Sequence, residues 1–242
     1  PISDGATELF LLLLNAPKNQ TTMGKEKQHF NTPLVLDASS PIIQAGIAKE
    51  KGWRKITYSE KPALNGVFET ISTLLRDLKI KISQVDAVFF CAGPGSTLGL
   101  RLTLAFIKTM QWEKQSGLSL FSYNALDLAA RMSPQKIPFI QAPFRMGWRF
   151  VRSKEGNSSF GKKQILNTED ALKNYPDSLH LPDPRKKNPG IDPSKILGYE
   201  IKKVNGLTDL IPVSEEKKEL EVYNPKPPKF KKWHPELTFL KP

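Results

Sequence analysis

Residues 33–58 read PLVLDASSPIIQAGIAKEKGWRKITY, and this stretch decides the fold. The apolar run at residues 34–36 enters the turn-forming cluster DASSP, and two further runs, at residues 42–48 and 53–58, are separated near Gly52. Short apolar runs between such turn residues are typical of β-strands. We therefore predict that this stretch forms an antiparallel meander of three strands.

The hydrophobic pattern changes to a helical period of about 3.6 residues after the meander. The apolar residues that share one face of the predicted helix are Val67, Phe68, Ile71, Leu74, Leu75 and Leu78. Residues 86–92 are an almost continuous apolar run, as in a strand buried on both faces, and GPGS at 93–96 ends it. Residues 98–112 predict a helix that is apolar on nearly every side. Such a helix must bury its second side either inside this chain or against a partner.

The next segments complete a β-β-β-α-β-α-β-α order. We predict a strand at residues 118–122, a helix at 124–132 and a strand at 137–142. This is the order of the ribonuclease-H-like half-domain in actin, sugar kinases and heat-shock ATPases. The predicted fold is therefore α/β, with one well-formed half-domain and a reduced second half, and fold alone does not identify a function.

Three regions follow from this pattern. Residues 1–32 are predicted to be a disordered N-terminal extension, residues 33–132 the ribonuclease-H-like domain, and residues 133–242 a reduced C-terminal domain. Within the extension, residues 1–22 are expected to be dispensable, since the sequence from Met23 reads like a natural start.

The C-terminal region has a weaker pattern, and 11 of the chain's 20 prolines lie between residues 151 and 242. Here we expect a strand at 148–152, a short helix at 168–173, and extended pieces at 210–213 and 220–223. The Pro- and Lys-rich tail after these pieces is expected to lie on the surface or to stay mobile.

The composition favours a soluble protein of a reducing compartment. No run approaches the roughly 20 apolar residues that span a membrane, so we expect a cytoplasmic protein without a membrane partner. The one cysteine, Cys91, has apolar neighbours and is expected to lie in the core rather than act as a nucleophile. A net charge of +12 attracts polyanions, with tRNA as the first candidate, but the charge is spread along the chain.

Two turns combine small residues and hydroxyls at the ends of predicted strands. Such turns let backbone N–H groups approach an anion, and the helix after the second turn adds a favourable dipole. The alternative is that both are merely tight turns. The candidate anion- or nucleotide-binding residues are Asp37, Ser39, Ser40, Gly93, Pro94, Gly95, Ser96, Thr97 and Arg101. Ser96 or Thr97 is expected to cap the following helix.

The same turns carry a resemblance to the TsaB (YeaZ) family. Residues 34–40 (LVLDASS), 85–88 (VDAV) and 93–101 (GPGSTLGLR) resemble its Asp-Thr-Ser start and its Gly-Pro-Gly-Ser-Phe-Thr-Gly-Leu-Arg signature. Residues 122–126 (SYNAL) also resemble the stretch after the family's next strand. The similarity covers about residues 33–132. Beyond it, residues 145–147 keep only Arg-Met-Gly of the family's usual Asp-Ala-Arg-Met-Gly-Glu-Val-Tyr, and the acid of that stretch is absent.

The resemblance implies a non-catalytic scaffold in the modification of tRNA adenosine next to the anticodon. TsaB proteins pair with the TsaD-type subunit, which binds metal and transfers the threonylcarbamoyl group, and a TsaE-type ATPase joins the complex. The expectation is therefore no cofactor beyond weakly held nucleotide, tRNA contact through the complex, and a possible homodimer without the partner. The three histidines, His29, His180 and His234, lack metal-site spacing and are expected on the surface or in loops.

The family pairs through the two helices predicted near residues 64–78 and 98–112. The residues expected at this partner interface are Phe68, Ile71, Leu75, Ile107 and Met110. Replacing an outward residue such as Ile107 or Met110 by a charge should then weaken association and leave the fold intact.

Two other functions stay open. In an ATP-dependent kinase-like or glycoprotease-like enzyme of the same fold, Asp37 would orient a metal-bound phosphate or activate water. A kinase also needs a second nucleotide-binding half, for which residues 151–242 offer no convincing candidate. In a basic tRNA-binding module, lysines of the tail would grip phosphates while Phe230 or Trp233 stacks on a base.

Overall fold

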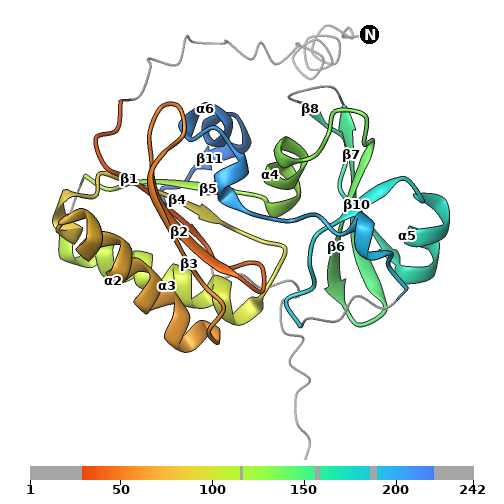
Figure 1. Cartoon of the computed structure of the whole chain (residues 1–242), viewed down its shortest axis with the longest axis horizontal. Coiled ribbons are helices and arrows are strands. Elements are labelled where there is room, and N and C mark those ends of the chain that lie inside the picture. The colour runs from red at the N-terminus through yellow and green to blue at the C-terminus, as the bar shows by residue number, and fades with distance from the viewer. Residues whose placement is uncertain (1–28, 115–116, 156–158, 186–189, 221–242) are drawn as a thin grey trace, which may run out of the picture. The chain divides into compact units, whose positions relative to one another are not determined.

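The computed structural model describes residues 29–114, 117–155, 159–185 and 190–220 (Figure 1). The chain divides into residues 1–30 and 31–242, and every element below belongs to the second of these. The expectations for residues 1–28 and for the tail from residue 221, including Trp233, Phe230 and His234, lie outside the described residues.

The first sheet contains six strands in the order β11-β5-β4-β1-β2-β3. Their bounds are β1 Pro33–Asp37, β2 Ile43–Ala48, β3 Trp53–Ser59, β4 Ala87–Cys91, β5 Ser119–Tyr123 and β11 Ser214–Glu216. β1, β2 and β3 are antiparallel, whereas β4 is parallel to both β1 and β5. The predicted meander is therefore confirmed, and the mixed sheet is ribonuclease-H-like, as expected.

Helices cover both faces of this sheet. On one face, α2 (Ala63–Leu78) and α3 (Thr97–Lys114) lie side by side over a dry core that includes Leu34, Val88 and Phe90 (Figure 1). The opposite face carries the alternate strand residues, and here the Phe89 and Phe121 rings stack with centroids 4.7 Å apart. α4 (Ala125–Met132) begins at Asn124, whose side chain accepts a hydrogen bond from the Leu126 N–H. The two long helices and α4 were all predicted from the sequence.

The second sheet is built from residues 139–180. It contains β6 (Phe139–Arg145), β7 (Trp148–Glu155), β8 (Ser159–Phe160), β9 (Gln164–Asn167) and β10 (Ser178–His180), with α5 (Thr168–Asn174) between the last two. β6 and β7 form an antiparallel hairpin, β9 pairs with β7, and β10 pairs with β6 in parallel. β6, β7 and α5 were predicted, whereas the short strands β8, β9 and β10 were not.

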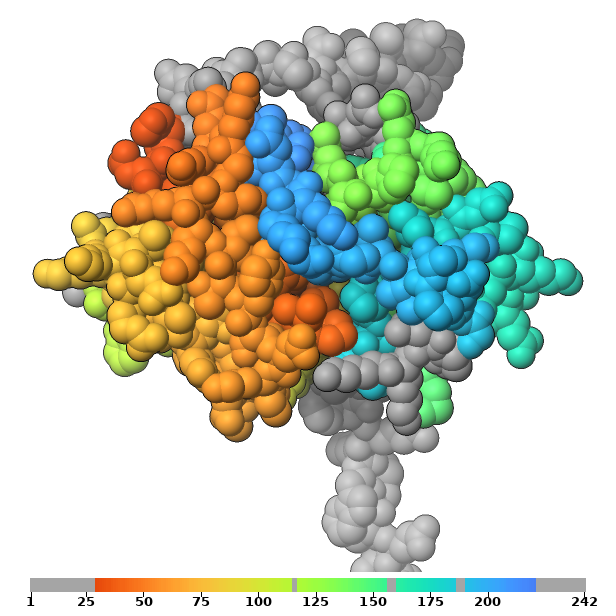
Figure 2. Space-filling view, in the orientation of Figure 1, coloured from red at the N-terminus to blue at the C-terminus, as the bar shows by residue number. Residues whose placement is uncertain are grey.

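The residues after the second sheet return to the first. The Trp53 indole donates to the Val204 carbonyl at 3.0 Å, and the Leu207 N–H donates to the Lys49 carbonyl at 2.9 Å. Figure 2 shows these blue C-terminal residues lying against the orange residues of the first sheet. Gly206 has a φ of 58° and lies so close to Gly52 that a Cβ atom would clash with the Gly52 carbonyl, so glycine is required there.

One C-terminal prediction is wrong. Residues 210–213 are helical rather than extended, because α6 (Leu207–Leu210) runs into a 3-10 turn at Ile211–Val213. Pro212 lies in the first turn of that 3-10 segment, where its missing N–H is tolerated. The extended piece instead follows as β11, which pairs with β5. Further 3-10 turns lie at Ile82–Gln84, Pro193–Lys195 and Ile201–Lys203.

Among the described residues, no helix combines the length and the apolar character needed to cross a bilayer.

Candidate functional site

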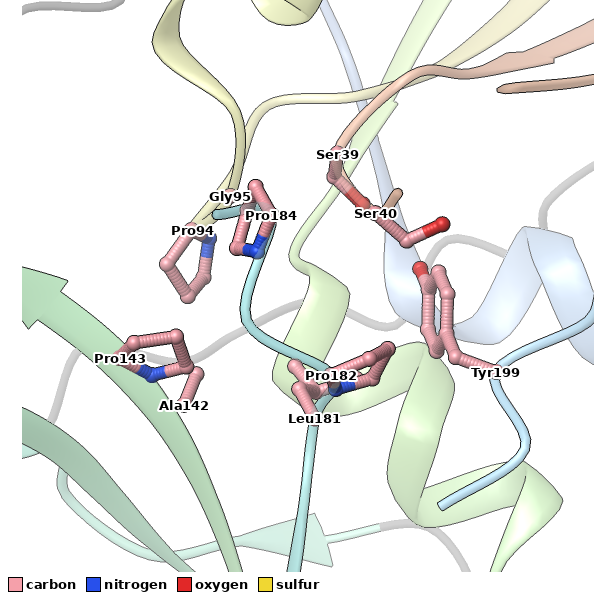
Figure 3. Close-up of a pocket in the computed structure, with 10 residues that line it drawn as sticks. All are labelled: Ser39, Ser40, Pro94, Gly95, Ala142, Pro143, Leu181, Pro182, Pro184 and Tyr199. Carbon is pink, nitrogen blue, oxygen red and sulfur yellow. The ribbon is translucent and has the colours of Figure 1, made fainter. Parts of the chain in front are cut away.

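The two predicted turns lie side by side because β1 and β4 are parallel neighbours and each turn follows the carboxyl end of its strand. The Ser96 N–H donates to the Ser39 carbonyl at 2.8 Å, which joins the turns directly. Figure 3 shows Ser39 and Ser40 facing Pro94 and Gly95 across a narrow space.

Two glycines allow this close approach. A Cβ atom on Gly95 would clash with the Ser39 carbonyl, and one on Gly99 would clash with the Ala38 carbonyl. Ser96 caps α3, as predicted, because its hydroxyl accepts from the Gly99 N–H at 3.2 Å. Gly95 and Gly99 therefore have a packing role that requires no ligand.

Asp37 is fully buried, and residues of this chain surround its carboxylate. One oxygen accepts from the Ser39 N–H at 2.9 Å and from the Ser39 hydroxyl at 2.6 Å. The other accepts from the Tyr123 hydroxyl at 2.9 Å and the Tyr199 hydroxyl at 2.7 Å. The carboxylate thus receives four hydrogen bonds, and a phosphate-bound metal ion would have to displace one of these donors to reach it.

Burial beside this carboxylate suppresses ionisation of its neighbours. Desolvation, and then the negative charge of Asp37, raise the pKa values of Tyr123 and Tyr199 well above the usual range. Burial, followed by the charge of Asp37, likewise raises the pKa of the Cys91 thiol. Cys91 is 2% exposed, which confirms its expected place in the core, and its thiol is poorly suited to nucleophilic attack.

Residues from the C-terminal region fill the space in front of the turns. Leu181, Pro182 and Pro184 approach from one side, and the Tyr199 hydroxyl points toward the Ser39–Ser40 turn (Figure 3). The cavity that remains has a volume of about 10 Å³, which is roughly the space of one water molecule. A nucleotide would need this segment to move. A wider pocket of about 240 Å³ lies on the other side of Ser40, beside Lys61 and Ser96.

Tyr199 reaches this site through an anchored backbone. The Gln44 amide donates to the Tyr199 carbonyl at 3.1 Å and accepts from the Ile201 N–H at 2.8 Å. Gln44 lies on β2 and is 1% exposed. Neither Tyr123 nor Tyr199 was among the predicted site residues. The two remaining candidates, Thr97 and Arg101, are exposed at the first turns of α3.

His180 corrects the expectation that the histidines lie on the surface or in loops. It is 3% exposed on β10, and its Nδ1 lies 3.0 Å from an amino nitrogen of buried Arg149. Burial, with the neighbouring charges of Arg149 and Lys195, lowers the pKa of His180 to about 4. Burial also lowers the pKa of Arg149 to about 10. Within the described ranges, no group of three metal-ligating side chains could hold a metal ion.

The helical surface, meaning the outward side of α2 and α3, differs from the predicted interface. Ile71, Leu75, Ile107 and Met110 are all buried in the core beneath the helices, so the expectation that Ile107 and Met110 face outward is wrong. The exposed apolar residues of this surface are Leu64 (63%), Phe68 (44%), Leu98 (54%) and Trp112 (85%). Phe68 also meets Phe106 of α3 edge to face, with centroids 6.2 Å apart. Of the predicted interface residues, Phe68 alone is exposed.

A comparison with models of protein families gives a match to the part of the chain that contains α2 and α3. Residues 64–140 match the TsaD family. The family is described as tRNA N6-adenosine threonylcarbamoyltransferase, and the match runs from α2 through α3 to β6. It omits β1, Asp37 and residues 141–242. The TsaD match therefore includes the GPGS turn and the helical surface but leaves out the Asp37 side of the site.

Comparisons with solved structures find partial matches. YeaZ from Pseudomonas aeruginosa is 20% identical, with a TM-score of 0.48, and the alignment covers 57% of this chain and 68% of that one. A second structure, a protein with similarity to peptidase YeaZ from the same organism, is also 20% identical with a TM-score of 0.48, over 62% of this chain and 75% of that one. The activator of 2-hydroxyisocaproyl-CoA dehydratase from Clostridium difficile is 10% identical with a TM-score of 0.36, over 58% and 46% of the two chains. No curated protein sequence matches the chain.

Proposed function

We propose that this chain is a TsaB-type, non-catalytic subunit that pairs with a TsaD-type transferase in the threonylcarbamoyl modification of tRNA. The single observation that carries this proposal is the coincidence of the TsaD match at residues 64–140 with an exposed apolar surface on α2 and α3. The resemblance of residues 34–40 and 93–101 to the TsaB signature supports the same role.

The helical surface has the character of a pairing surface. Trp112 is 85% exposed and Leu64 is 63% exposed, and a patch of large exposed apolar side chains is a mark of a protein-interaction site. The partner that fits is a subunit of related fold, which would present the equivalent helix pair and form a bundle of four helices. A homodimer through the same surface is the expected state when that partner is absent.

A passive role for Asp37 separates this proposal from an enzyme of the same fold. Its carboxylate is held by Ser39, Tyr123 and Tyr199, and the cavity in front of the two turns is about 10 Å³. Phosphoryl or acyl transfer requires a cleft that admits the substrate beside a positioned acid, base or metal. We accordingly propose that Asp37 fixes the turns, that nucleotide is held weakly if at all, and that a TsaE-type ATPase and tRNA are met through the complex.

Reconstitution tests this function. The purified chain, a TsaD-type subunit and their mixture would be assayed for threonylcarbamoyl transfer to tRNA with the remaining components supplied. We expect transfer from the mixture and none from this chain alone. With Asp37→Asn, activity of the mixture should fall only as far as the amount of complex falls. Transfer or ATP hydrolysis by the chain alone, abolished by Asp37→Asn, would instead establish the enzyme.

A further inference from the structure

A second exposed apolar surface lies at one end of the second sheet. Its members are Met146 (87% exposed), Trp148 (37%) and Ile165 (47%), which come from the β6–β7 turn, β7 and β9. Phe150, which is only 7% exposed, is paired with Ile165 across β7 and β9 and has the same side-chain direction as Trp148, two residues before it. Figure 1 shows β6 and β7 side by side in this sheet. We call these residues, with Arg145 and Lys163, the hairpin surface.

Two exposed cations lie over the aromatic rings of the hairpin surface. The Arg145 guanidinium carbon is 4.8 Å from the Trp148 ring centroid, and the Lys163 ammonium is 4.9 Å from the Phe150 ring centroid. Within the described ranges, neither cation forms an ion pair with a carboxylate. By contrast, Arg152 of β7 is paired with Asp127. Arg145 and the exposed Lys163 are therefore available to an anionic ligand, and the charge of Lys163 also acts on the Asp127 carboxyl, where it offsets part of the rise in pKa that burial causes.

The surrounding sequence is strongly basic. Residues 143–166 contain six lysines and arginines and one acid, Glu155. The acids that follow, Glu169 and Asp170, belong to α5, which packs on the other face of the sheet, where the Gln141 side chain donates to the Ala171 carbonyl. Arg149 of this set is buried on that other face and Arg152 is paired with Asp127, so the exposed cations of the segment are Arg145, Lys162 and Lys163.

Flat rings beside unpaired cations are the features that single-stranded RNA requires of a protein. Phosphates pair with lysine and arginine, while unstacked bases stack on aromatic rings or guanidinium planes. An anionic membrane also attracts cations, but insertion needs apolar side chains that project outward, and Trp148 lies beneath Arg145 with about a third of its surface exposed. Among the described residues of this surface, only the Met146 side chain is almost fully exposed.

We propose that the hairpin surface binds a single-stranded segment of RNA. Arg145 and Lys163 contact phosphates, and Trp148 with the Arg145 guanidinium stacks on a base. This surface is separate from the helical surface, so RNA binding by the chain alone does not depend on the proposed pairing with a TsaD-type subunit.

The test is fluorescence anisotropy of a labelled single-stranded oligouridine with the full chain at several salt concentrations. Trp148→Ala should weaken binding about tenfold with little change in the salt slope, because stacking is largely independent of salt. Trp148→Phe should restore most of the affinity. Arg145→Ala/Lys163→Ala should lower the slope of log affinity against log salt by about 1.4, since each single-strand phosphate contact contributes about 0.7.

Matched controls distinguish this site from general attraction. Trp112→Ala removes another exposed tryptophan, and Arg76→Ala/Lys108→Ala removes two exposed charges from the helical surface. Both should bind RNA like the unmodified chain, with all variants melting within a few degrees of it. Equal losses in the two double variants would overturn the proposal. So would loss of RNA binding in Trp233→Ala alone, which places the site in the tail, or binding to phosphatidylserine vesicles that depends on Trp148 without any RNA affinity.

Discussion

The helical surface and the hairpin surface both expose large apolar side chains, but they differ in charge and in what supports them. α2 and α3 together carry four basic and three acidic residues, whereas residues 143–166 carry six and one. Beneath the helices lies a dry core, while beneath the hairpin lies a polar network of Gln141, Arg149 and His180. Near-neutral apolar helices over a rigid core suit a protein partner, and a basic aromatic sheet edge suits a polyanion.

The largest expected effect is a difference in the free energy of unfolding between variants on the buried side and the exposed side of α3. Ile107→Glu places a charge in the core, so we expect it to lower the free energy of unfolding by about 4 kcal/mol or more. Trp112→Glu on the outer side of α3 should change it by less than about 0.5 kcal/mol. Denaturant unfolding measures both. Similar losses for the two variants would mean that the two sides of α3 do not differ as described.

The polar network beneath the hairpin surface should make the stability of the protein depend on pH, because it contains His180. The folded-state pKa of His180, about 4, is below the unfolded value of about 6.5, because burial and then Arg149 and Lys195 disfavour the charged ring. As the pH falls from 6.5 toward 4, the unfolded chain therefore takes up a proton that the folded chain does not. We expect stability to fall by about 3 kcal/mol over this window and to be fully present above it.

His180→Asn provides the control for this acid effect, since it keeps an acceptor for Arg149 and cannot titrate. The free energy of unfolding of the variant should depend less on pH between 6.5 and 4. Hydrogen exchange should place the loss in the unmodified chain first in the second sheet. An unchanged pH profile in His180→Asn would assign the effect to other groups.

Tyr199 tests the contact that joins the C-terminal region to the first sheet. Tyr199→Phe removes a hydrogen bond of 2.7 Å to a buried carboxylate and should lower the free energy of unfolding by about 2 kcal/mol. Tyr58→Phe is the matched control, because Tyr58 is 40% exposed, and should have almost no effect. Thermal and denaturant unfolding measure the loss in each variant. Equal losses in Tyr199→Phe and Tyr58→Phe would contradict the structural role of Tyr199.

Local patterns predicted β1 to β5 of the first sheet and the helices α2, α3 and α4, because those elements bury faces with a clear period, but they did not predict β11. The same reasoning failed for Ile107 and Met110, since a helix that is apolar on most sides does not reveal which side meets the sheet. It also failed for residues 210–213, whose apolar composition suits a strand although Pro212 lies in the first turn of a 3-10 segment.

The candidate site was predicted in part. The small residues of the two turns indicated a close approach, which Gly95 and Gly99 make possible. The donors to Asp37 were missed because Tyr199 lies 162 residues away in sequence and has no periodic context. His180 was misplaced for a similar reason, since the short strand β10 that buries it has no recognisable pattern.

The central claim is that the helical surface, and not the hairpin surface, pairs with a TsaD-type subunit. Trp112→Glu and Met146→Glu test it most directly, because their native side chains are 85% and 87% exposed on the two surfaces. In calorimetric titration against a TsaD-type subunit, Trp112→Glu should weaken binding at least about thirtyfold, or roughly 2 kcal/mol, while Met146→Glu binds like the unmodified chain. Unchanged binding by Trp112→Glu together with weakened binding by Met146→Glu would contradict it.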